Sequence, residues 1–158
     1  MAEQDAATRI WDMVKSSHIC LLVTKNGARL RARPMGVTPK REEHALYLLT
    51  DARRAKDAEI MADDQVCLAF HTGSADYVSI SGSAVVSDDR AKIRELWSVA
   101  AKAWWDSAED PNIRVIKITP EEGEFWDGPG RAIAYVKMAA AAISGTRPDV
   151  GKTGRAAL

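Results

Sequence analysis

Residues 76–87 read Asp76-Tyr77-Val78-Ser79-Ile80-Ser81-Gly82-Ser83-Ala84-Val85-Val86-Ser87. Apolar side chains at positions 78, 80, 84 and 86 alternate with the side chains at positions 77, 79, 81 and 83. A period of two residues is typical of a β-strand that turns one face to the core and presents a polar face on the other side. The sequence therefore predicts one long, half-buried strand as part of a sheet.

Shorter runs of the same kind lie on both sides of this strand. Asn26-Gly27 is a strong signal for a two-residue hairpin, because both residue types tolerate a positive φ. Pro120 predicts an interruption, and Gly128-Pro129-Gly130 predicts the end of the sheet. The other predicted strands cover residues 18–24, 28–39, 45–50, 65–71, 112–119 and 123–126.

Four segments show helical periodicity, over residues 5–17, 54–62, the stretch after Asp88-Asp89 up to Trp105, and residues 132–143. Asp88-Asp89 supplies an N-cap for the third of them. Trp11 and Trp97 fall on the core faces of their helices. We expect one domain over residues 1–144 and a tail over residues 145–158. That tail is poor in apolar residues, and we expect it to be frayed or to lie on a neighbouring subunit.

The order of these elements favours an α+β, mainly β fold. Six or so strands, with 123–126 counted as a continuation of 112–119 beyond Pro120, are joined mostly by hairpins and interrupted by short helices; they predict an antiparallel six-stranded sheet that closes into a small split β-barrel with flanking helices. A parallel, doubly wound sheet is disfavoured. It would need a helix between successive strands, and the chain has no Gly-rich strand-to-helix turn of the dinucleotide-binding type.

Composition disfavours several classes of partner. The 158 residues carry 22 basic and 22 acidic side chains, so the overall charge gives no reason to expect nucleic acid or an anionic membrane. No apolar run reaches the ~20 residues that span a bilayer, and the acidic N-terminus is unlike a secretory signal, so we expect a cytoplasmic protein. Cys20 and Cys67 lie in apolar strands and are interpreted as small buried hydrophobes, ahead of metal or disulfide roles.

A basic cluster stands at the start of the second predicted helix. Arg53, Arg54 and Lys56 lie where free backbone N–H groups already favour an anion. Cations oppose the helix dipole at this end, so their placement indicates a bound anion such as a phosphate. The alternative is that they are ordinary solvated surface cations.

Two further features point to the same kind of site. Arg33-Pro34-Met35 places a proline in a strand, which predicts a sheet edge; the strand is then either a plain edge or the place where a planar ring takes hydrogen bonds from the backbone. Trp126 stands beside the Gly-Pro-Gly break and either packs or contacts a cofactor or a second subunit. Of Trp104 and Trp105, one is expected to be buried and the other to face a partner.

Chemistry borne by the protein alone finds little support in the sequence. His18, His44 and His71 lie in unrelated elements without metal-ligand spacing, and the serines of residues 76–87 have no base partner. Any reaction would therefore depend on a cofactor. A small barrel that binds nucleic acid through the face of Arg29, Arg31 and Arg33 is a minor alternative.

In this order, the motifs resemble those of the FMN-binding split-barrel group related to pyridoxamine phosphate oxidase, and most closely its general stress protein branch. The resemblance covers residues 10–143. The motifs that carry it are Arg33-Pro34-Met35, Leu46-Tyr47-Leu48-Leu49-Thr50, Lys56 with Glu59-Ile60, Tyr77-Val78-Ser79-Ile80-Ser81-Gly82, Glu95-Leu96-Trp97, Ala103-Trp104-Trp105 before Asp110-Pro111, and Glu124-Phe125-Trp126-Asp127.

The resemblance implies a homodimer with two flavin mononucleotides in clefts between the subunits; FAD is the alternative flavin. It assigns Arg33 and Lys56 to the phosphate. It assigns the backbone of Pro34 and Met35 and the pair Leu49-Thr50 to the isoalloxazine and ribityl chain. Tyr77 stands where the oxidases carry a glutamine near the ring, and Trp126 would come from the partner subunit. Arg53 or Arg54 would compensate for a missing serine-arginine pair.

The same resemblance shapes the expected activity. The oxidases follow their EFW motif with an Arg-Leu-His-Asp-Arg run that grips the substrate, whereas this chain continues Pro129-Gly130-Arg131-Ala132-Ile133-Ala134, which argues against vitamin B6 oxidation. We expect an FMN-dependent oxidoreductase that exchanges electrons with a small-molecule donor or acceptor. The alternative is a flavin-binding stress or sensor protein without turnover.

Overall fold

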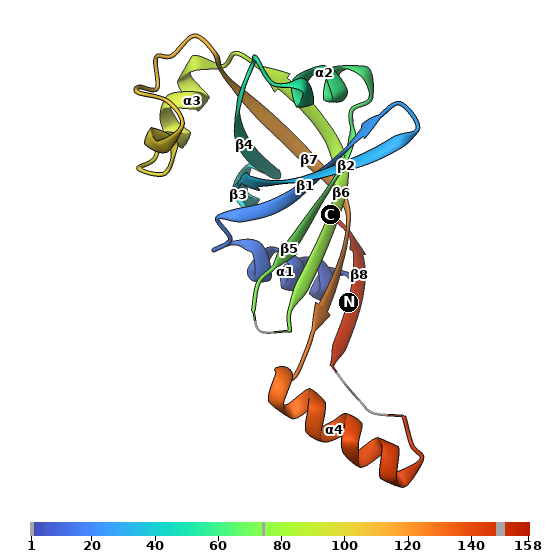
Figure 1. The fold of residues 1–158 in the computed structure, drawn as a ribbon. Coiled ribbons are helices and arrows are strands. Elements are labelled where there is room, and N and C mark those ends of the chain that lie inside the picture. The colour runs from blue at the N-terminus through green and yellow to red at the C-terminus, as the bar shows by residue number, and fades with distance from the viewer. Residues whose placement is uncertain (1, 74, 148–150) are drawn as a thin grey trace.

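The computed structural model describes residues 2–73, 75–147 and 151–158; Met1, Ser74 and residues 148–150 of the predicted tail lie outside the described residues. Within the described chain, eight strands form one sheet with four α-helices around it (Figure 1). None of the described helices is long and apolar enough to cross a membrane. In chain order, the elements are α1 (Ala2–Val14), β1 (Ile19–Asn26), β2 (Arg29–Gly36), β3 (Thr38–Lys40), the 3₁₀ helix η1 (Arg41–Glu43), β4 (Ala45–Asp51), α2 (Ala55–Ala62), β5 (Gln65–His71), β6 (Tyr77–Ser87), α3 (Arg90–Leu96), the 3₁₀ helix η2 (Ala101–Ala103), β7 (Ile113–Asp127), α4 (Arg131–Ser144) and β8 (Lys152–Ala157).

Neighbouring strands are antiparallel in every described pair, in the order β2-β1-β5-β6-β7-β4-β3, and β8 pairs with β7. β2 and β3 stand at opposite ends of this order, yet only Val37 separates them in the chain. The sheet therefore curls until its two ends meet at Val37, whose N–H donates to the carbonyl of His18 over 3.1 Å. The predicted antiparallel, barrel-like fold is confirmed, with eight strands in place of six.

The first hairpin and the edge strand follow the sequence closely. Asn26 pairs with Arg29, which leaves Gly27 and Ala28 as the turn, one residue later than predicted, and Gly27 has a φ of +61°. Among the described strands β2 pairs only with β1, so Pro34 lies on a sheet edge as predicted. The single strand predicted over residues 28–39 is divided, because the chain leaves one end of the sheet at Val37 and enters the other.

β6 and β7 form the longest pair of the sheet. Val78, Ile80 and Ala84 are buried on one face of β6, as their alternation predicts. The predicted break at Pro120 is wrong, because β7 continues through it; Pro120 pairs with Gly82, and the pairing shifts by one residue at Glu121, which is left without a partner in β6. A Cβ at position 82 would lie 2.2 Å from the Thr119 carbonyl oxygen, so only glycine allows this close approach.

Two apolar cores lie on either side of the sheet. The main core contains Ile10, Trp11 and Val14 of α1, which pack against strand residues such as Leu22, Leu68, Ile80 and Ile118. The second core lies on the other side of β4 and β7 and contains Ala45, Tyr47, Ile93, Ala101, Trp105, Ile113 and Val115. Trp97 packs against the second core, so both Trp11 and Trp97 are structural, as predicted.

The long helix predicted up to Trp105 is wrong. Its N-cap is confirmed, because the Asp89 carboxylate accepts from the Lys92 N–H over 3.0 Å, but α3 ends at Leu96 and Trp97 is extended. Ile93 and Trp105 share the second core, whereas twelve residues of straight helix would separate them by about 18 Å. The chain therefore turns back through η2 to bury Trp105.

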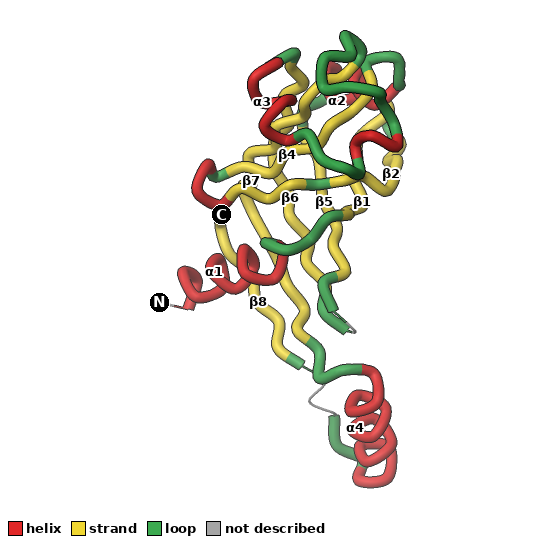
Figure 2. The backbone as a smooth tube through the Cα atoms, turned by 90° about the vertical axis from the view of Figure 1, so that its left-hand side faces the viewer, coloured by secondary structure: helices red, strands yellow, loops and turns green. Residues whose placement is uncertain are grey.

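The C-terminal segment does not fray over its whole length. β7 leads into α4, which projects away from the barrel, and β8 then returns to pair with residues 122–127 of β7 (Figures 1 and 2). Ala156 is buried, and Leu158 packs against the main core. The expected frayed tail is therefore wrong for Lys152–Ala157. β8 covers an edge of β7 that would otherwise expose unpaired backbone groups.

Candidate functional site

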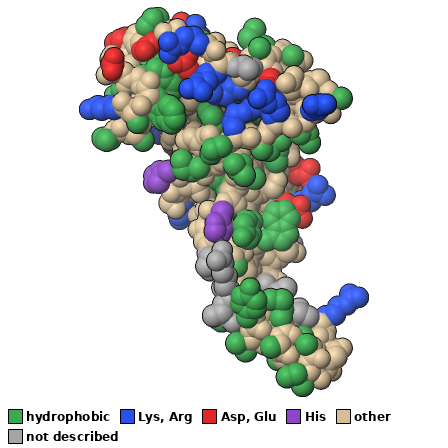
Figure 3. All heavy atoms as spheres, in the orientation of Figure 1, with side chains coloured by type: hydrophobic (Ala, Val, Ile, Leu, Met, Phe, Trp, Pro, Cys, Tyr) green, Lys and Arg blue, Asp and Glu red, His purple; other side chains and the backbone are tan. Residues whose placement is uncertain are grey.

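A cavity of about 890 Å³ opens where β2, the end of β4, the start of α2 and the η2 segment come together. Lys and Arg side chains gather over the part of the surface where Figure 1 places α2 and β2 (Figure 3). Eight of the ten predicted site residues line the cavity. They are Arg33, Pro34, Met35, Leu49, Thr50, Arg53, Arg54 and Lys56.

The turn from β4 into α2 brings the basic side chains to the cavity. Thr50 ends the buried part of β4, and the Arg54 N–H donates to the Asp51 carbonyl over 3.0 Å to close the turn. Arg54 occupies the N-cap of α2 without a side-chain hydrogen bond to the helix. The first backbone N–H groups of α2 thus lack a side-chain cap, next to Lys56 in the first turn.

Arg33, Arg54 and Lys56 form what we call the basic end of the cavity. Among the described residues, no carboxylate oxygen lies within 4 Å of the Arg54 or Lys56 side-chain nitrogens. Burial, helped by the positive charges of Arg54 and Arg33, lowers the pKa of Lys56 below its ordinary value, and the charge of Asp57 opposes that shift. Lys56 is thus a partly buried cation without a carboxylate partner, and such a group favours an anion at this position.

Arg53 behaves differently from its neighbours. Its Nε lies 2.8 Å from one carboxylate oxygen of Asp51 and its Nη2 lies 2.5 Å from the other. These bonds hold the pKa of Asp51 well below its usual range, and the Trp105 indole N–H also donates to Asp51 over 3.3 Å. Arg53 is therefore already neutralised, although it lines the same cavity.

Arg33 is held by a buried network that we call the Glu59 network. The Glu59 carboxylate accepts from the Thr24 hydroxyl over 2.6 Å, from Arg33 Nη2 over 2.8 Å and from Arg31 Nη1 over 2.9 Å. Arg33 Nη1 also donates to the Thr24 oxygen over 2.8 Å. The hydrogen bond from Thr24, followed by that from Arg33, lowers the pKa of Glu59, so this carboxylate is ionised at neutral pH.

Leu96, Val99, Trp104 and Trp105 line what we call the aromatic end of the cavity. Trp105 is buried, whereas Trp104 is 72% exposed. The expected division of the two tryptophans is thus confirmed as far as burial goes. The sequence did not predict that both line the cavity.

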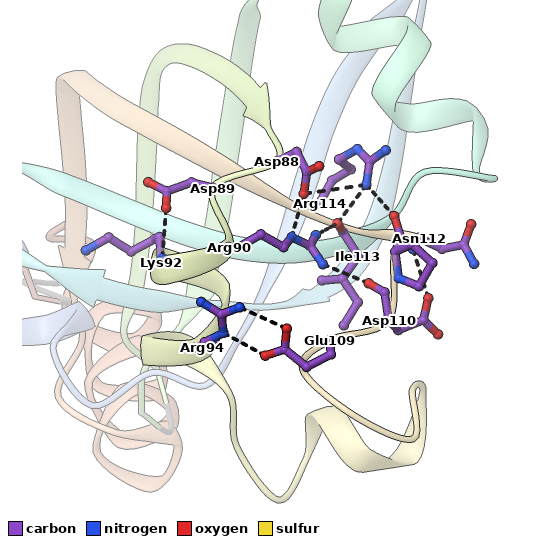
Figure 4. Close-up of polar contacts among 11 residues, drawn as sticks. Asp88, Asp89, Arg90, Lys92, Arg94, Glu109, Asp110, Asn112, Ile113 and Arg114 are labelled. Atoms are coloured by element: carbon purple, nitrogen blue, oxygen red, sulfur yellow. Dashed lines mark hydrogen bonds and ion pairs between the residues drawn. The ribbon is translucent and has the colours of Figure 1, made fainter.

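The loop between α3 and β7 carries these two tryptophans, and arginines of α3 bind its far end. Arg94 of α3 binds both carboxylate oxygens of Glu109, over 2.6 and 2.9 Å (Figure 4). The Arg90 guanidinium donates to the carbonyls of Asp110 and Ile113, and it lies 2.6 Å from an Asp88 oxygen (Figure 4). These contacts join the start of the loop, in α3, to its last residues before β7.

The two remaining predicted residues lie elsewhere in this chain. Tyr77 and Trp126 pair across β6 and β7, and the Tyr77 ring stacks on His71 at a centroid distance of 4.8 Å. Neither lines the cavity, and Trp126 is 39% exposed. A contact of Trp126 with the cofactor of a partner subunit, and of Tyr77 with the ring, stays a prediction.

Residues beyond the predicted set also contribute to the site. Arg31, Glu59 and Tyr47 line the cavity, although none of them was among the residues predicted to bind the cofactor. The signal for the first two was present, since Arg31 shares a face of β2 with Arg33, and Glu59 follows Lys56 by one helical turn. The Tyr47 hydroxyl donates to the exposed Glu43 of η1 over 2.5 Å, so its proton is already engaged there.

Other chemistries find no support in the described part of the chain. No group of three or more His, Cys, Asp or Glu residues could hold a metal ion there. Cys20 is buried as predicted, and burial raises its pKa to about 12. Cys67 is only half-buried, with its Sγ 3.3 Å from the Ser79 hydroxyl, and both cysteines are free.

Comparison with known proteins identifies the family of this chain. The profile of the family described as "Pyridoxamine 5'-phosphate oxidase like" matches residues 5–149. The chain belongs to this family. Its curated relative General stress protein 26 of Bacillus subtilis (strain 168) is 26% identical over 129 residues, which cover 77% of this chain and 89% of the relative.

Solved structures of this family share the fold. A Jannaschia sp. CCS1 protein described as a general stress protein 26 superposes with a TM-score of 0.77 at 24% identity, covering 98% of this chain and 99% of that one. The general stress FMN/FAD binding protein of Xanthomonas citri gives a TM-score of 0.68 at 23% identity, covering 78% and 89%. The resemblance read from the sequence motifs is thus confirmed at the level of family and fold.

Proposed function

We propose that this protein binds FMN in the cavity and acts as an FMN-dependent oxidoreductase. The observation that carries the proposal is the basic end, where Arg54 and Lys56 stand beside the uncapped start of α2 in the same cavity as exposed aromatic surface. A phosphate and a planar ring joined by a flexible chain match these two ends. The flavin-binding relative from Xanthomonas citri adds support.

The residues present fit the phosphate of such a cofactor. Lys56, Arg54 and the free N–H donors of Arg33 would bind its oxygens, together with the first backbone N–H groups of α2. Charge-assisted hydrogen bonds contribute about 1.5–3 kcal/mol each, so two or three of them with stacking of about 1 kcal/mol approach the roughly 8 kcal/mol of micromolar binding. The five basic side chains that line the cavity, against two acidic ones, favour an anionic ligand.

The rest of the cavity fits the ring. β2 is a sheet edge at Pro34 and Met35, so the backbone groups that point away from β1 can hydrogen-bond a ligand, although Pro34 offers only its carbonyl; Leu49 and Thr50 also line the cavity. When bound, the isoalloxazine supplies the redox chemistry, and this chain's residues hold and orient it. Among the described residues of the cavity we find no paired acid and base poised for proton transfer, which is consistent with cofactor-borne chemistry.

The proposed assembly is a homodimer in which Trp126 of one subunit covers the cofactor of the other. Trp126 is partly exposed and does not line the cavity of its own chain, which supports a contact with the flavin of the other subunit. We further propose that the reaction partner is a small electron donor or acceptor other than a vitamin B6 phosphate, because the substrate-gripping run after the EFW motif is missing here.

Flavin titration tests the binding step. Flavin-free protein is titrated with FMN, FAD and riboflavin while flavin fluorescence is followed. We expect FMN to bind at micromolar concentration or tighter, and to bind at least tenfold more tightly than riboflavin, because riboflavin lacks the phosphate. Equal affinity for FMN and riboflavin, or no binding of either, would reject the proposed phosphate site.

A reduction assay separates the enzyme from a binding protein without turnover. The FMN-loaded protein is mixed anaerobically with a reduced nicotinamide, and the flavin absorbance is followed before and after admission of air. Bleaching followed by recovery supports an oxidoreductase. A flavin that binds tightly but never bleaches with any small donor supports the alternative, a flavin-binding stress or sensor protein.

A further inference from the structure

Glu59 is a buried acidic residue in the wall of a cavity that is otherwise basic. Its side chain is only 7% exposed, and its two oxygens accept three hydrogen bonds, from Thr24, Arg31 and Arg33. A buried carboxylate is retained only when it is paired and hydrogen-bonded, and this one meets both conditions within the protein. The Glu59 network therefore forms before any ligand binds.

The network determines how Arg33 is presented to the cavity. Its two terminal nitrogens each use one N–H, toward Thr24 and Glu59, and both acceptors are buried. A guanidinium has five N–H donors, so three stay available to other acceptors. The Arg33 side chain is 22% exposed, which leaves part of it accessible from the cavity.

We propose that Glu59 is a positioning residue for anion binding: with Thr24 it fixes the Arg33 guanidinium so that its remaining donors serve the ligand's phosphate. This inference rests on the proposed FMN site and adds to it a residue that does not itself touch the phosphate. Arg31 completes the charge balance, because two arginines share one carboxylate and leave a net positive group.

Charge alone predicts the opposite effect. A carboxylate close to an anion site repels the anion, so its neutralisation would tighten phosphate binding. Positioning predicts weaker binding, because a guanidinium released from Glu59 samples other orientations and loses its preorganised geometry. The sign of one measured change therefore separates the two roles.

The test is Glu59→Gln, which removes the charge but keeps the size of the side chain. Affinities for FMN and riboflavin are measured at the same ionic strength by flavin fluorescence. We expect FMN affinity to fall about tenfold while riboflavin affinity changes less than about twofold, because only FMN carries the phosphate. Unchanged or tighter FMN binding overturns the proposal, and an equal loss for both flavins assigns Glu59 a purely structural role.

Two further variants keep the result decisive. Lys117→Gln is the control: it removes an exposed cation of β7 that lies outside the cavity, and it should leave the FMN-to-riboflavin ratio unchanged. If Glu59→Gln does not fold, Thr24→Val decides, because it removes the second acceptor of Arg33 without changing side-chain shape. A ratio unchanged in Thr24→Val would then reject the proposal.

The outcome is distinguishable from failure of the proposed function itself. If the unaltered protein does not prefer FMN over riboflavin, the phosphate site is wrong and Glu59 has nothing to position. If the unaltered protein prefers FMN and Glu59→Gln keeps that preference, the phosphate site stands and only the positioning role is lost.

Discussion

The two ends of the cavity are built on different physical principles. The basic end lies on β2 and the start of α2, and its Arg33 is held by hydrogen bonds to two buried side chains, Thr24 and Glu59. The aromatic end lies on a loop without long regular structure, held by Arg90 and Arg94 at its base and by buried Trp105 at its tip. The first fixes charge in place, whereas the second presents apolar surface that a ligand can cover.

This difference assigns a separate part of a ligand to each end. Fixed charge discriminates by the presence of a phosphate, and an exposed indole discriminates by the presence of a planar ring. FMN has both parts and riboflavin has only the ring. Changes at the basic end should therefore alter the ratio of the two affinities, and changes at the aromatic end should alter both affinities equally.

Lys56→Ala tests the basic end and should have the largest effect of the variants proposed. Loss of one charge-assisted contact of about 1.5–3 kcal/mol should weaken FMN binding roughly 10- to 100-fold. Riboflavin affinity should change less than about twofold, because Lys56 lies at the basic end and riboflavin has no phosphate for it to bind. Both are measured by fluorescence titration.

The exposed Lys117 of β7 offers a matched control, since it lies outside the cavity. Lys117→Ala removes the same charge from the protein and should leave FMN affinity unchanged. A similar loss in both variants would show that only the net charge matters, and the basic end would then not be a localised site.

Trp104→Ala tests the aromatic end and should have a smaller effect. Loss of a stacking contact of about 0.5–1.5 kcal/mol should weaken FMN and riboflavin alike, by roughly 2- to 10-fold, with their ratio preserved. Trp104→Phe should retain most of the affinity. The variant should fold normally, because this side chain is 72% exposed.

A fall in FMN affinity alone, or none for either flavin, would contradict this assignment. The first result would place Trp104 near the phosphate, and the basic and aromatic ends would then not bind separate parts of the ligand. The second result would mean that Trp104 does not contact the flavin, and the expectation from the sequence that one of the two tryptophans faces a partner would then apply to it.

Features of the fold that depend on neighbouring residues in the sequence could be predicted, whereas features that depend on contacts between distant segments could not. Alternation along β6 predicted its buried face, because each side chain's face follows from the sequence alone. β8 was missed because it contains no large apolar side chain and its placement depends on the free edge of β7, which no local pattern reveals. The end of α3 at Leu96 was missed for a similar reason, since Trp105 joins a core made by distant strands.

The site shows the same limit. Lys56 and Arg33 were expected to share a ligand, and the structure brings them to one cavity. The sequence could not separate Arg53 from Arg54, because the difference lies in which guanidinium meets the Asp51 carboxylate. The sequence shows where the cations stand along the chain, but tertiary contacts determine which of them have a carboxylate partner.

The pH dependence of binding sharpens the comparison further. The Lys56 pKa is lowered, so its ammonium loses its proton at a lower pH than an ordinary lysine near 10.5. FMN affinity should therefore fall, by a few-fold, as the pH rises from neutrality toward 10.5, because the phosphate remains charged while Lys56 becomes neutral. Riboflavin, which has the same ring, corrects for ionisation of the flavin itself.

Lys56→Arg should abolish this fall, because a guanidinium stays protonated throughout the range. A pH profile identical in both proteins would mean that Lys56 does not provide the titrating charge. Trp104→Ala should leave the shape of the profile unchanged, because the aromatic end has no titrating group.

Arg53→Gln should have the smallest effect, although Arg53 is adjacent in sequence to Arg54. Its charge is already balanced by both oxygens of Asp51, and its side chain is mostly exposed, so FMN affinity should change less than about twofold. Arg54→Gln, which removes a cation without such a partner, should cost several-fold, measured by the same titration. If Arg53→Gln proved the more damaging change, Arg53 would have to leave Asp51 on ligand binding, and the Trp105 indole would then lose the fixed acceptor that links the basic end to the aromatic end.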